Sequence, residues 1–209
     1  MAIIKTETKQ RTIGKAVSLS GVGLHTGDEV KLTFKPGTEN SGFIFERTDL
    51  EGSPKIEADA NYVTNTQRGT CLEKNGVTIQ TCEHVLAALV GLDLDNVIIE
   101  LNASEPPIMD GSSKFFVEEL EKAGIVEQEA YREVYEVTQI VSYADEETGS
   151  ELIVMPSNSY QVTTMVDFGT KVLGTQNATL TKVTDFKTEI ANARTFSFLH
   201  EIEMLLEHG

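Results

Sequence analysis

Glu83 and His84 are the neighbouring residues whose side chains are best suited to catalysis. They precede an apolar stretch, residues 85–89, that predicts a helix, and Thr81 just before them is able to cap it. The side chains of two adjacent residues in the first turn of a helix can both reach the same point beyond the end of the helix. The helix dipole favours an ionised carboxylate there. Because carboxylate and imidazole groups activate a zinc-bound water, the pair indicates hydrolysis; a solvated structural pair is the alternative.

Three further residues carry side chains suited to catalysis or ligand binding, and each also has a purely structural interpretation. His25 lies among the three glycines of residues 21–27, so either a tight loop presents it to a ligand or the segment is a glycine-rich hairpin. Asp110 either reaches a site or ends a loop before the next helix. The hydroxyl of Thr195 either helps to hold an oxyanion or belongs to an ordinary strand or loop.

The two cysteines, Cys71 and Cys82, are too few for a disulfide scaffold and are expected to be buried free thiols. Cys82 and His84 stand two residues apart on the predicted helix and point about 200° away from each other, which excludes a catalytic dyad. The sequence also lacks the GxSxG elbow and the Walker phosphate loop.

Length and composition are those of a soluble protein with one large domain or two small ones. The 209 residues are 40% hydrophobic and 24% charged. The net charge of −16 argues against a nucleic-acid partner but allows a small anionic ligand in a local basic pocket. No apolar run approaches the roughly 18 to 20 residues of a membrane span, so we expect a cytoplasmic protein without stable membrane insertion.

The first part of the chain predicts a mixture of strands and helices. Asn75 and Gly76 form a strong hairpin-turn signal. Gly91 and Gly124 are suited to end the two predicted helices. The expected strands are residues 30–34, 42–47, 55–58, 69–73, 77–79 and 96–101, and the helices are residues 82–91 and 113–123. Such an order of elements predicts an α+β layer structure.

The charged residues 127–133 contain almost no aliphatic side chain and indicate a domain boundary. Strand patterns resume in residues 134–143, 151–155 and 160–167, and helices are predicted over residues 180–190 and 198–208. The last of these helices has an apolar face that needs a partner, which suggests that chain is missing after it.

Five segments together resemble the zinc-dependent UDP-3-O-acyl-N-acetylglucosamine deacetylases of lipid A biosynthesis. They occur in the family's order and at similar spacing: residues 20–27, 81–89, 95–100, 107–112 and 193–196. The resemblance implies an α+β fold of two similar domains, each a β-sheet with a helical layer, with the helices sandwiched between the sheets. We expect a first domain at 1–126, a linker at 127–133 and an incomplete second domain at 134–209.

The resemblance also implies a zinc ion held by two histidines and one aspartate. His84 would be the first ligand, and Glu83 would be the general base that takes a proton from the attacking water. The reaction is hydrolysis of the N-acetyl group of a UDP-linked, acylated glucosamine. Thr195 would stabilise the tetrahedral oxyanion.

Substrate contacts are implied for three more residues. His25 would lie near the metal and the sugar. Asp167 and Phe168 match a segment that contacts the nucleotide in the family, although residues 169–171 depart from the family's pattern. The sequence does not specify an oligomeric state.

One part of the family's site is absent from this sequence. The other two zinc ligands belong to a later His-Lys-x-x-Asp segment, and the catalytic acid is a histidine further on. Only His200 and His208 follow His84, and neither has a suitable aspartate. Because a catalytic zinc needs three protein ligands, we expect two ligands beyond residue 209 and an inactive chain alone. Some relatives continue into a 3-hydroxyacyl-acyl-carrier-protein dehydratase domain. The alternative is a non-catalytic binding or structural module that has lost the metal site.

Overall fold

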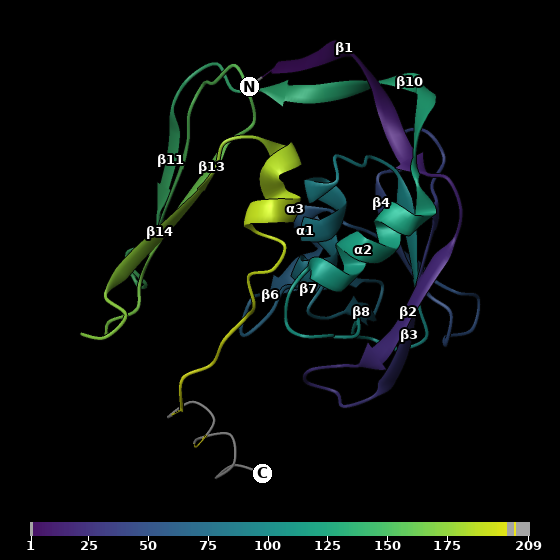
Figure 1. Cartoon of the computed structure of the whole chain (residues 1–209), viewed down its shortest axis with the longest axis horizontal. Helices are drawn as coiled ribbons and strands as arrows, with labels where there is room; N and C mark the ends of the chain where they lie inside the picture. The colour runs from purple at the N-terminus through teal and green to yellow at the C-terminus, as the bar shows by residue number, and fades with distance from the viewer. Residues whose placement is uncertain (1, 200–202, 204–209) are drawn as a thin grey trace.

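A five-stranded sheet forms the centre of the protein, which is represented by a computed structural model that describes residues 2–199 and 203 (Figure 1). Its strand order is β2-β3-β9-β4-β5, and all neighbours are antiparallel except the parallel pair β4 and β9. The strands are β2 (Val17–Val22), β3 (Glu29–Pro36), β9 (Val97–Leu101), β4 (Phe43–Arg47) and β5 (Lys55–Glu57). The predicted strands over 30–34, 42–47, 55–58 and 96–101 are therefore confirmed.

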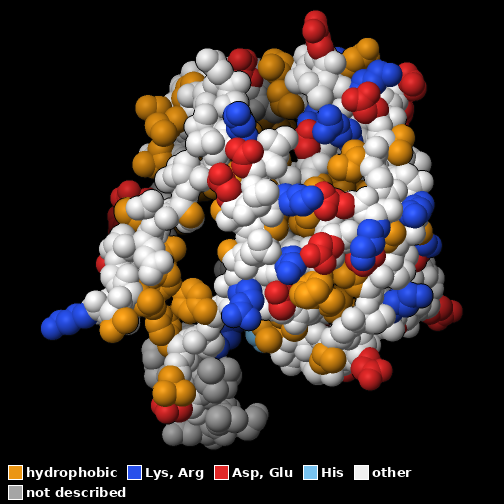
Figure 2. Space-filling view, in the orientation of Figure 1, with side chains coloured by type: hydrophobic (Ala, Val, Ile, Leu, Met, Phe, Trp, Pro, Cys, Tyr) orange, Lys and Arg blue, Asp and Glu red, His pale blue; other side chains and the backbone are white. Residues whose placement is uncertain are grey.

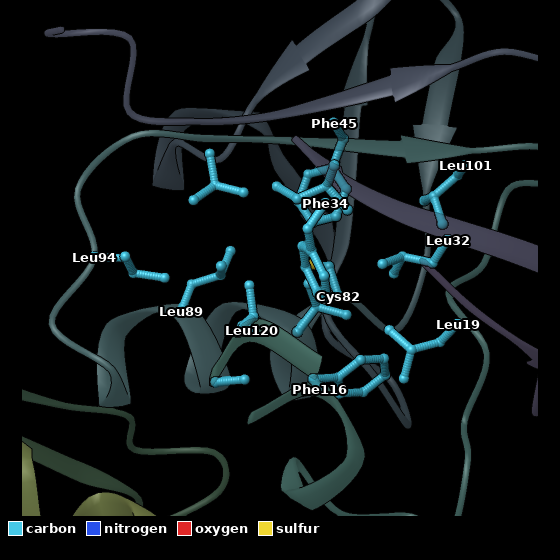
Figure 3. Packing of buried hydrophobic residues seen from close by; sticks show 14 of the residues in the cluster. Leu19, Leu32, Phe34, Phe45, Cys82, Leu89, Leu94, Leu101, Phe116 and Leu120 are labelled. Carbon is cyan, nitrogen blue, oxygen red and sulfur yellow. The ribbon is translucent and has the colours of Figure 1, made fainter. Parts of the chain in front are cut away.

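One face of this sheet carries the hydrophobic core. Side chains alternate along β3, so that Val30, Leu32 and Phe34 are buried between exposed or partly exposed neighbours. The two predicted helices, α1 (Glu83–Gly91) and α2 (Lys114–Ala123), are present and pack against this face (Figure 3). The ring of Phe116 meets that of Phe34 edge to face, with centroids 6.3 Å apart.

A small three-stranded sheet leads into α1. It consists of β6 (Val63–Asn65), β7 (Cys71–Lys74) and β8 (Val77–Ile79), and the 3-10 helix η1 (Ala60–Tyr62) precedes it. Asn75 and Gly76 join β7 to β8 with φ angles of 53° and 77°, as the predicted two-residue turn requires. This sheet brings residues 65–71 close to the start of α1.

A long antiparallel ribbon joins the two ends of the first half of the chain. β1 (Ala2–Ile13) pairs with β10 (Ile125–Glu136). Residues 127–133, predicted as a linker, form the middle of β10, so they are a strand held by its partner β1. The domain bounds on either side of them stay a prediction.

The rest of the described chain forms two hairpins and a short helical segment. β11 (Val141–Ala144) pairs with β12 (Glu151–Val154), and β13 (Val162–Asp167) pairs with β14 (Thr175–Leu180). The helix predicted over residues 180–190 is wrong in its extent, because β14 continues to residue 180 and only η2 (Val183–Asp185) and α3 (Phe186–Glu189) follow. Of the helix predicted over residues 198–208, positions 200–202 and 204–209 lie outside the described residues.

The α+β fold class is confirmed. In Figure 1 the helices lie between the five-stranded sheet on one side and the two hairpins on the other. α3 reaches α1 through Phe186, whose ring occupies the space beside Gly91. Among the residues that the structure describes, no helix is long and apolar enough to cross a membrane.

Candidate functional site

The turn that begins α1 is held from outside the helix. Glu83 is the first residue of α1, and Cys82 at the N-cap position makes no side-chain capping bond. The prediction that Thr81 caps the helix is wrong. Thr81 has a φ of 50°, and its hydroxyl donates a 2.8 Å hydrogen bond to Oε1 of Glu105 instead.

Glu105 connects this turn to the loop that carries His25. Its side chain is fully buried, and Oε2 accepts 3.0 Å hydrogen bonds from the backbone N–H groups of His25 and Thr26. The Thr26 hydroxyl donates to the same oxygen at 3.1 Å. Burial alone would raise the pKa of the Glu105 carboxyl, but the donors on Thr26, Thr81 and His25 outweigh it and hold this pKa below its usual value.

A polar pocket of about 440 Å³ opens where these segments meet. His25 is exposed at its rim, and Nε2 of its ring lies 3.4 Å from the carbonyl oxygen of Arg68. The residues that line the pocket come from the His25 loop, the 65–71 segment and the chain before α1: His25, Asn65, Gln67, Arg68, Gly69, Cys71, Gln80 and Thr81. The segment is the glycine-rich hairpin between β2 and β3, and its loop also brings His25 to the pocket; contact of His25 with a ligand stays a prediction.

Glu83 and His84 are both half-buried next to this region. Oε2 of Glu83 accepts a 2.9 Å hydrogen bond from the backbone N–H of Thr70, which orients its carboxylate toward the 65–71 segment. The backbone carbonyl of His84 accepts a 2.9 Å bond from the Ser113 hydroxyl, which ties α1 to the start of α2. The base candidate is thus fixed to the same segment that lines the pocket.

Asp110 organises the loop before α2. Its Oδ1 accepts hydrogen bonds from the backbone N–H of Ser112 at 3.1 Å and from the Ser112 hydroxyl at 2.6 Å. The Ser112 oxygen in turn accepts from the N–H of Lys114, the first residue of α2. These contacts favour the structural alternative for Asp110, although this residue also lines a second pocket of about 410 Å³.

Thr195 lies beside this loop, and Phe168 lies close to the residue after Thr195. The backbone N–H of Thr195 donates a 2.8 Å bond to the carbonyl of Gly111, and the Thr195 side chain is exposed. The rings of Phe168 and Phe196 meet edge to face, with centroids 5.2 Å apart. Asp167 ends β13 and accepts a hydrogen bond from the N–H of Gly169.

The sequence-predicted site residues therefore form two groups. His25 and Glu83 share the region of the first pocket, whereas Thr195 shares a neighbourhood with Phe168. Within the described ranges, no hydrogen bond or ring contact joins Thr195 or Phe168 to His25, Glu83 or His84.

Metal-binding groups do not cluster in the described part of the chain. No group of three His, Cys, Asp or Glu side chains there is arranged to hold an ion. Cys82 is buried as predicted and Cys71 is half-buried. Burial, reinforced by the charge of Glu83, raises the pKa of the Cys82 thiol to about 12, so this thiol stays protonated and is not a ready metal ligand.

Sequence reasoning missed Glu105 as a site residue. It follows the buried strand β9 closely, and prolines occupy the next two positions, which made the segment resemble a loop that only leads to Asp110. A charged residue so close to a central strand was the available signal, because a buried carboxylate requires several donors.

Comparison with known proteins gives a consistent match over nearly the whole chain. A family model described as UDP-3-O-acyl N-acetylglycosamine deacetylase matches residues 10–209. The bifunctional enzyme LpxC/FabZ of Bacteroides thetaiotaomicron is 44% identical over 201 residues, which cover 96% of this chain and 44% of that protein.

Relatives named UDP-3-O-acyl-N-acetylglucosamine deacetylase are also similar. That of Coxiella burnetii (strain Dugway 5J108-111) is 42% identical over 204 residues, covering 96% of this chain and 67% of the relative. That of Chromohalobacter salexigens is 40% identical over 200 residues, covering 94% of this chain and 65% of the relative. The chain thus spans less than half the length of the bifunctional relative and about two thirds of these two.

Proposed function

Because the chain belongs to the family of UDP-3-O-acyl-N-acetylglycosamine deacetylases, we propose that it is part of an enzyme that removes the N-acetyl group from UDP-3-O-acyl-N-acetylglucosamine. The observation that supports this proposal is a pocket lined by His25, by the 65–71 segment and by Thr81, with the carboxylate of Glu83 bonded to the N–H of Thr70 in that same segment. We place the reaction in the cytoplasm, in the synthesis of lipid A.

We propose that the enzyme needs zinc and that His84 supplies one of its ligands. The donors in the described part of the chain do not make a complete zinc site, since a catalytic zinc requires three protein ligands. Two ligands are proposed to lie beyond residue 209. When bound, zinc would supply Lewis acidity to the amide carbonyl and to water. The 209-residue chain alone is therefore proposed to be inactive.

The chain's own residues have distinct proposed roles. Glu83 accepts a proton from the attacking water, and its bond from the Thr70 N–H supports this role by orienting the carboxylate. The hydroxyl of Thr195 donates to the oxyanion that forms from the acetyl carbonyl. His25 contacts the sugar, and Asp167 and Phe168 contact the nucleotide.

Replacing Glu83 tests the proposal in a deacetylase-active polypeptide that contains this chain. Glu83→Ala is expected to lower kcat about a hundredfold or more, with bound zinc unchanged by elemental analysis. Glu118→Ala, an exposed glutamate on α2, is the matched control and should retain wild-type activity. Near-normal turnover by Glu83→Ala would remove Glu83 as the base.

The isolated 209-residue chain provides a second test. It should neither release acetate from the substrate nor retain one equivalent of zinc after gel filtration. One tightly held equivalent would contradict the proposed ligand set, whereas a polypeptide that holds zinc and binds substrate without turnover would favour the non-catalytic module.

A further inference from the structure

We propose that Glu105 is the positioning residue of this site: its carboxylate fixes the His25 loop against Thr81, two residues before the start of α1. The proposal rests on the proposed function for its catalytic consequence, while its structural part can be tested without turnover. Glu105 lies outside the pocket lining and acts through His25 and Glu83 rather than on the substrate itself.

Among the described residues, the charge of Glu105 is stabilised by hydrogen bonds alone. Its side chain is fully buried, and no lysine or arginine forms an ion pair with it in the described part of the chain. All of its hydrogen-bond donors belong to the two segments that bear on the pocket, namely the N–H groups of His25 and Thr26 and the hydroxyls of Thr26 and Thr81. Because a buried carboxylate without such donors is costly, the two segments must remain together for the charge to remain buried.

The backbone of Thr81 also depends on Glu105. A β-branched residue with a φ of 50° is a strained exception, and the surrounding contacts must hold it there. The 2.8 Å bond to Glu105 does so, and Thr81 is only two residues before Glu83. The position of the base candidate therefore depends on a side chain from another segment.

The His25 loop approaches Glu105 closely. A Cβ atom added to Gly23 would lie 2.7 Å from Oε2 of Glu105 and 2.3 Å from the Thr26 hydroxyl. The loop thus closes directly onto the carboxylate, and only glycine fits at this position. His25 follows two residues later, so its backbone N–H and its ring are placed by the same closure.

The structural test uses the assigned NMR spectra of the full 209-residue chain. Thr81→Val removes one bond to Glu105, whereas Thr81→Ser keeps the hydroxyl. We expect Glu105→Gln and Thr81→Val to shift the amide signals of His25 and Thr26 and the ring signals of His25. Thr81→Ser should restore them. Glu100→Gln is the control, since Glu100 lies on β9 and pairs with Lys35.

Two results would overturn the positioning role. One is a folded Glu105→Gln variant in which the His25 signals move no more than they do in Glu100→Gln. The other, decisive if Glu105→Gln does not fold, is a folded Thr81→Val variant with unchanged signals of His25 and Thr26. A merely stabilising contact would lower the unfolding midpoint and leave the ring signals of His25 in place, whereas the amide signals of His25 and Thr26 respond in Glu105→Gln directly to the change of their acceptor.

The catalytic test uses a deacetylase-active polypeptide that contains this chain. Thr81→Val should lower kcat about tenfold to a hundredfold with a smaller change in KM, and Thr81→Ser should recover kcat. A kcat for Thr81→Val equal to that of Thr81→Ser would overturn the catalytic consequence. Absence of deacetylation by the wild-type polypeptide would instead refute the proposed function and leave the NMR result to decide the role of Glu105.

Discussion

Hydrogen-bonded strands occur both before and after residue 126, but these two halves of the described chain bury very different amounts of their side chains. In β3 and β9, alternate residues such as Phe34 and Ile99 are fully buried under α1 and α2. In β11, β12 and β13 every residue is exposed. Figure 2 shows hydrophobic side chains on the outer surface of these hairpins, and Tyr143, Leu152 and Met165 are 68%, 64% and 72% exposed.

Backbone pairing and stability are therefore separate properties in this protein. The pair β13 and β14 is in continuous register over six residues, as regular as any pair in the central sheet. An isolated two-stranded hairpin is nevertheless marginal in water, because stability comes from the apolar face that a sheet buries. Phe186 and Ala191 are the only hydrophobic residues after position 126 that are buried in the described structure.

Amide hydrogen exchange should show the largest contrast between the halves. Amides of β3 and β9 should exchange only through global opening, while those of β13 and β14 should exchange through local opening of the hairpins. We expect protection factors about a thousandfold or more higher in the central sheet. Comparable protection of both pairs, measured by mass spectrometry or NMR, would show that burial does not distinguish the halves.

Phe186 should be the most sensitive position in the second half. Its ring is buried beside Gly91, where an added Cβ would lie 2.0 Å from Cδ1 of Phe186. Phe186→Ala should therefore cost about 3 kcal/mol of unfolding free energy in chemical denaturation. Tyr143→Ala, which truncates an exposed aromatic residue of β11, should cost less than about 0.5 kcal/mol. Equal costs would mean that α3 does not anchor the second half.

The elements predicted correctly are those whose signals are local. Asn75 and Gly76 specify their turn by their own conformational preferences, and the apolar runs at residues 85–89 and 96–101 specify a helix and a strand. The place of Glu83 at a helix start also follows from its local pattern. The roles of His25 and Glu83 stay predictions.

The features that local pattern does not specify depend on partners far away in the sequence. Thr81 resembles a helix cap, but Glu105 binds its hydroxyl and holds it at a positive φ. Residues 127–133 resemble a linker, but Gln128 within them accepts a 2.7 Å bond from the side chain of Asn96, and the stretch pairs with β1. Local pattern does not specify such contacts: a charged residue close to β9 indicates that Glu105 needs donors, but not that His25, Thr26 and Thr81 supply them.

The smallest predicted change in unfolding free energy concerns β10, the strand that leads from the first half of the chain into the second. Arg132 binds Asp93 at 2.6 Å and Asp95 at 2.9 Å, and its side chain is only 17% exposed. Although burial opposes its charge, these aspartates raise the pKa of Arg132. Arg132→Ala should cost about 2 kcal/mol of unfolding free energy, because Asp93 and Asp95 each lose a charged donor and keep only the bonds from Arg11.

The matched control lies on the same ribbon. Lys5 and Glu133 are 3.7 Å apart, and the Lys5 side chain is 82% exposed, so Lys5→Ala should cost about 0.5 kcal/mol or less. Added salt should further reduce the small loss of stability caused by Lys5→Ala. It should change the loss caused by Arg132→Ala less, because dissolved ions screen an exposed ion pair more strongly than a partly buried one. If both variants unfold at the same denaturant concentration, β10 is held by its backbone pairing with β1 and not by Arg132. The difference in stability between the two halves would then come from the hydrophobic core alone.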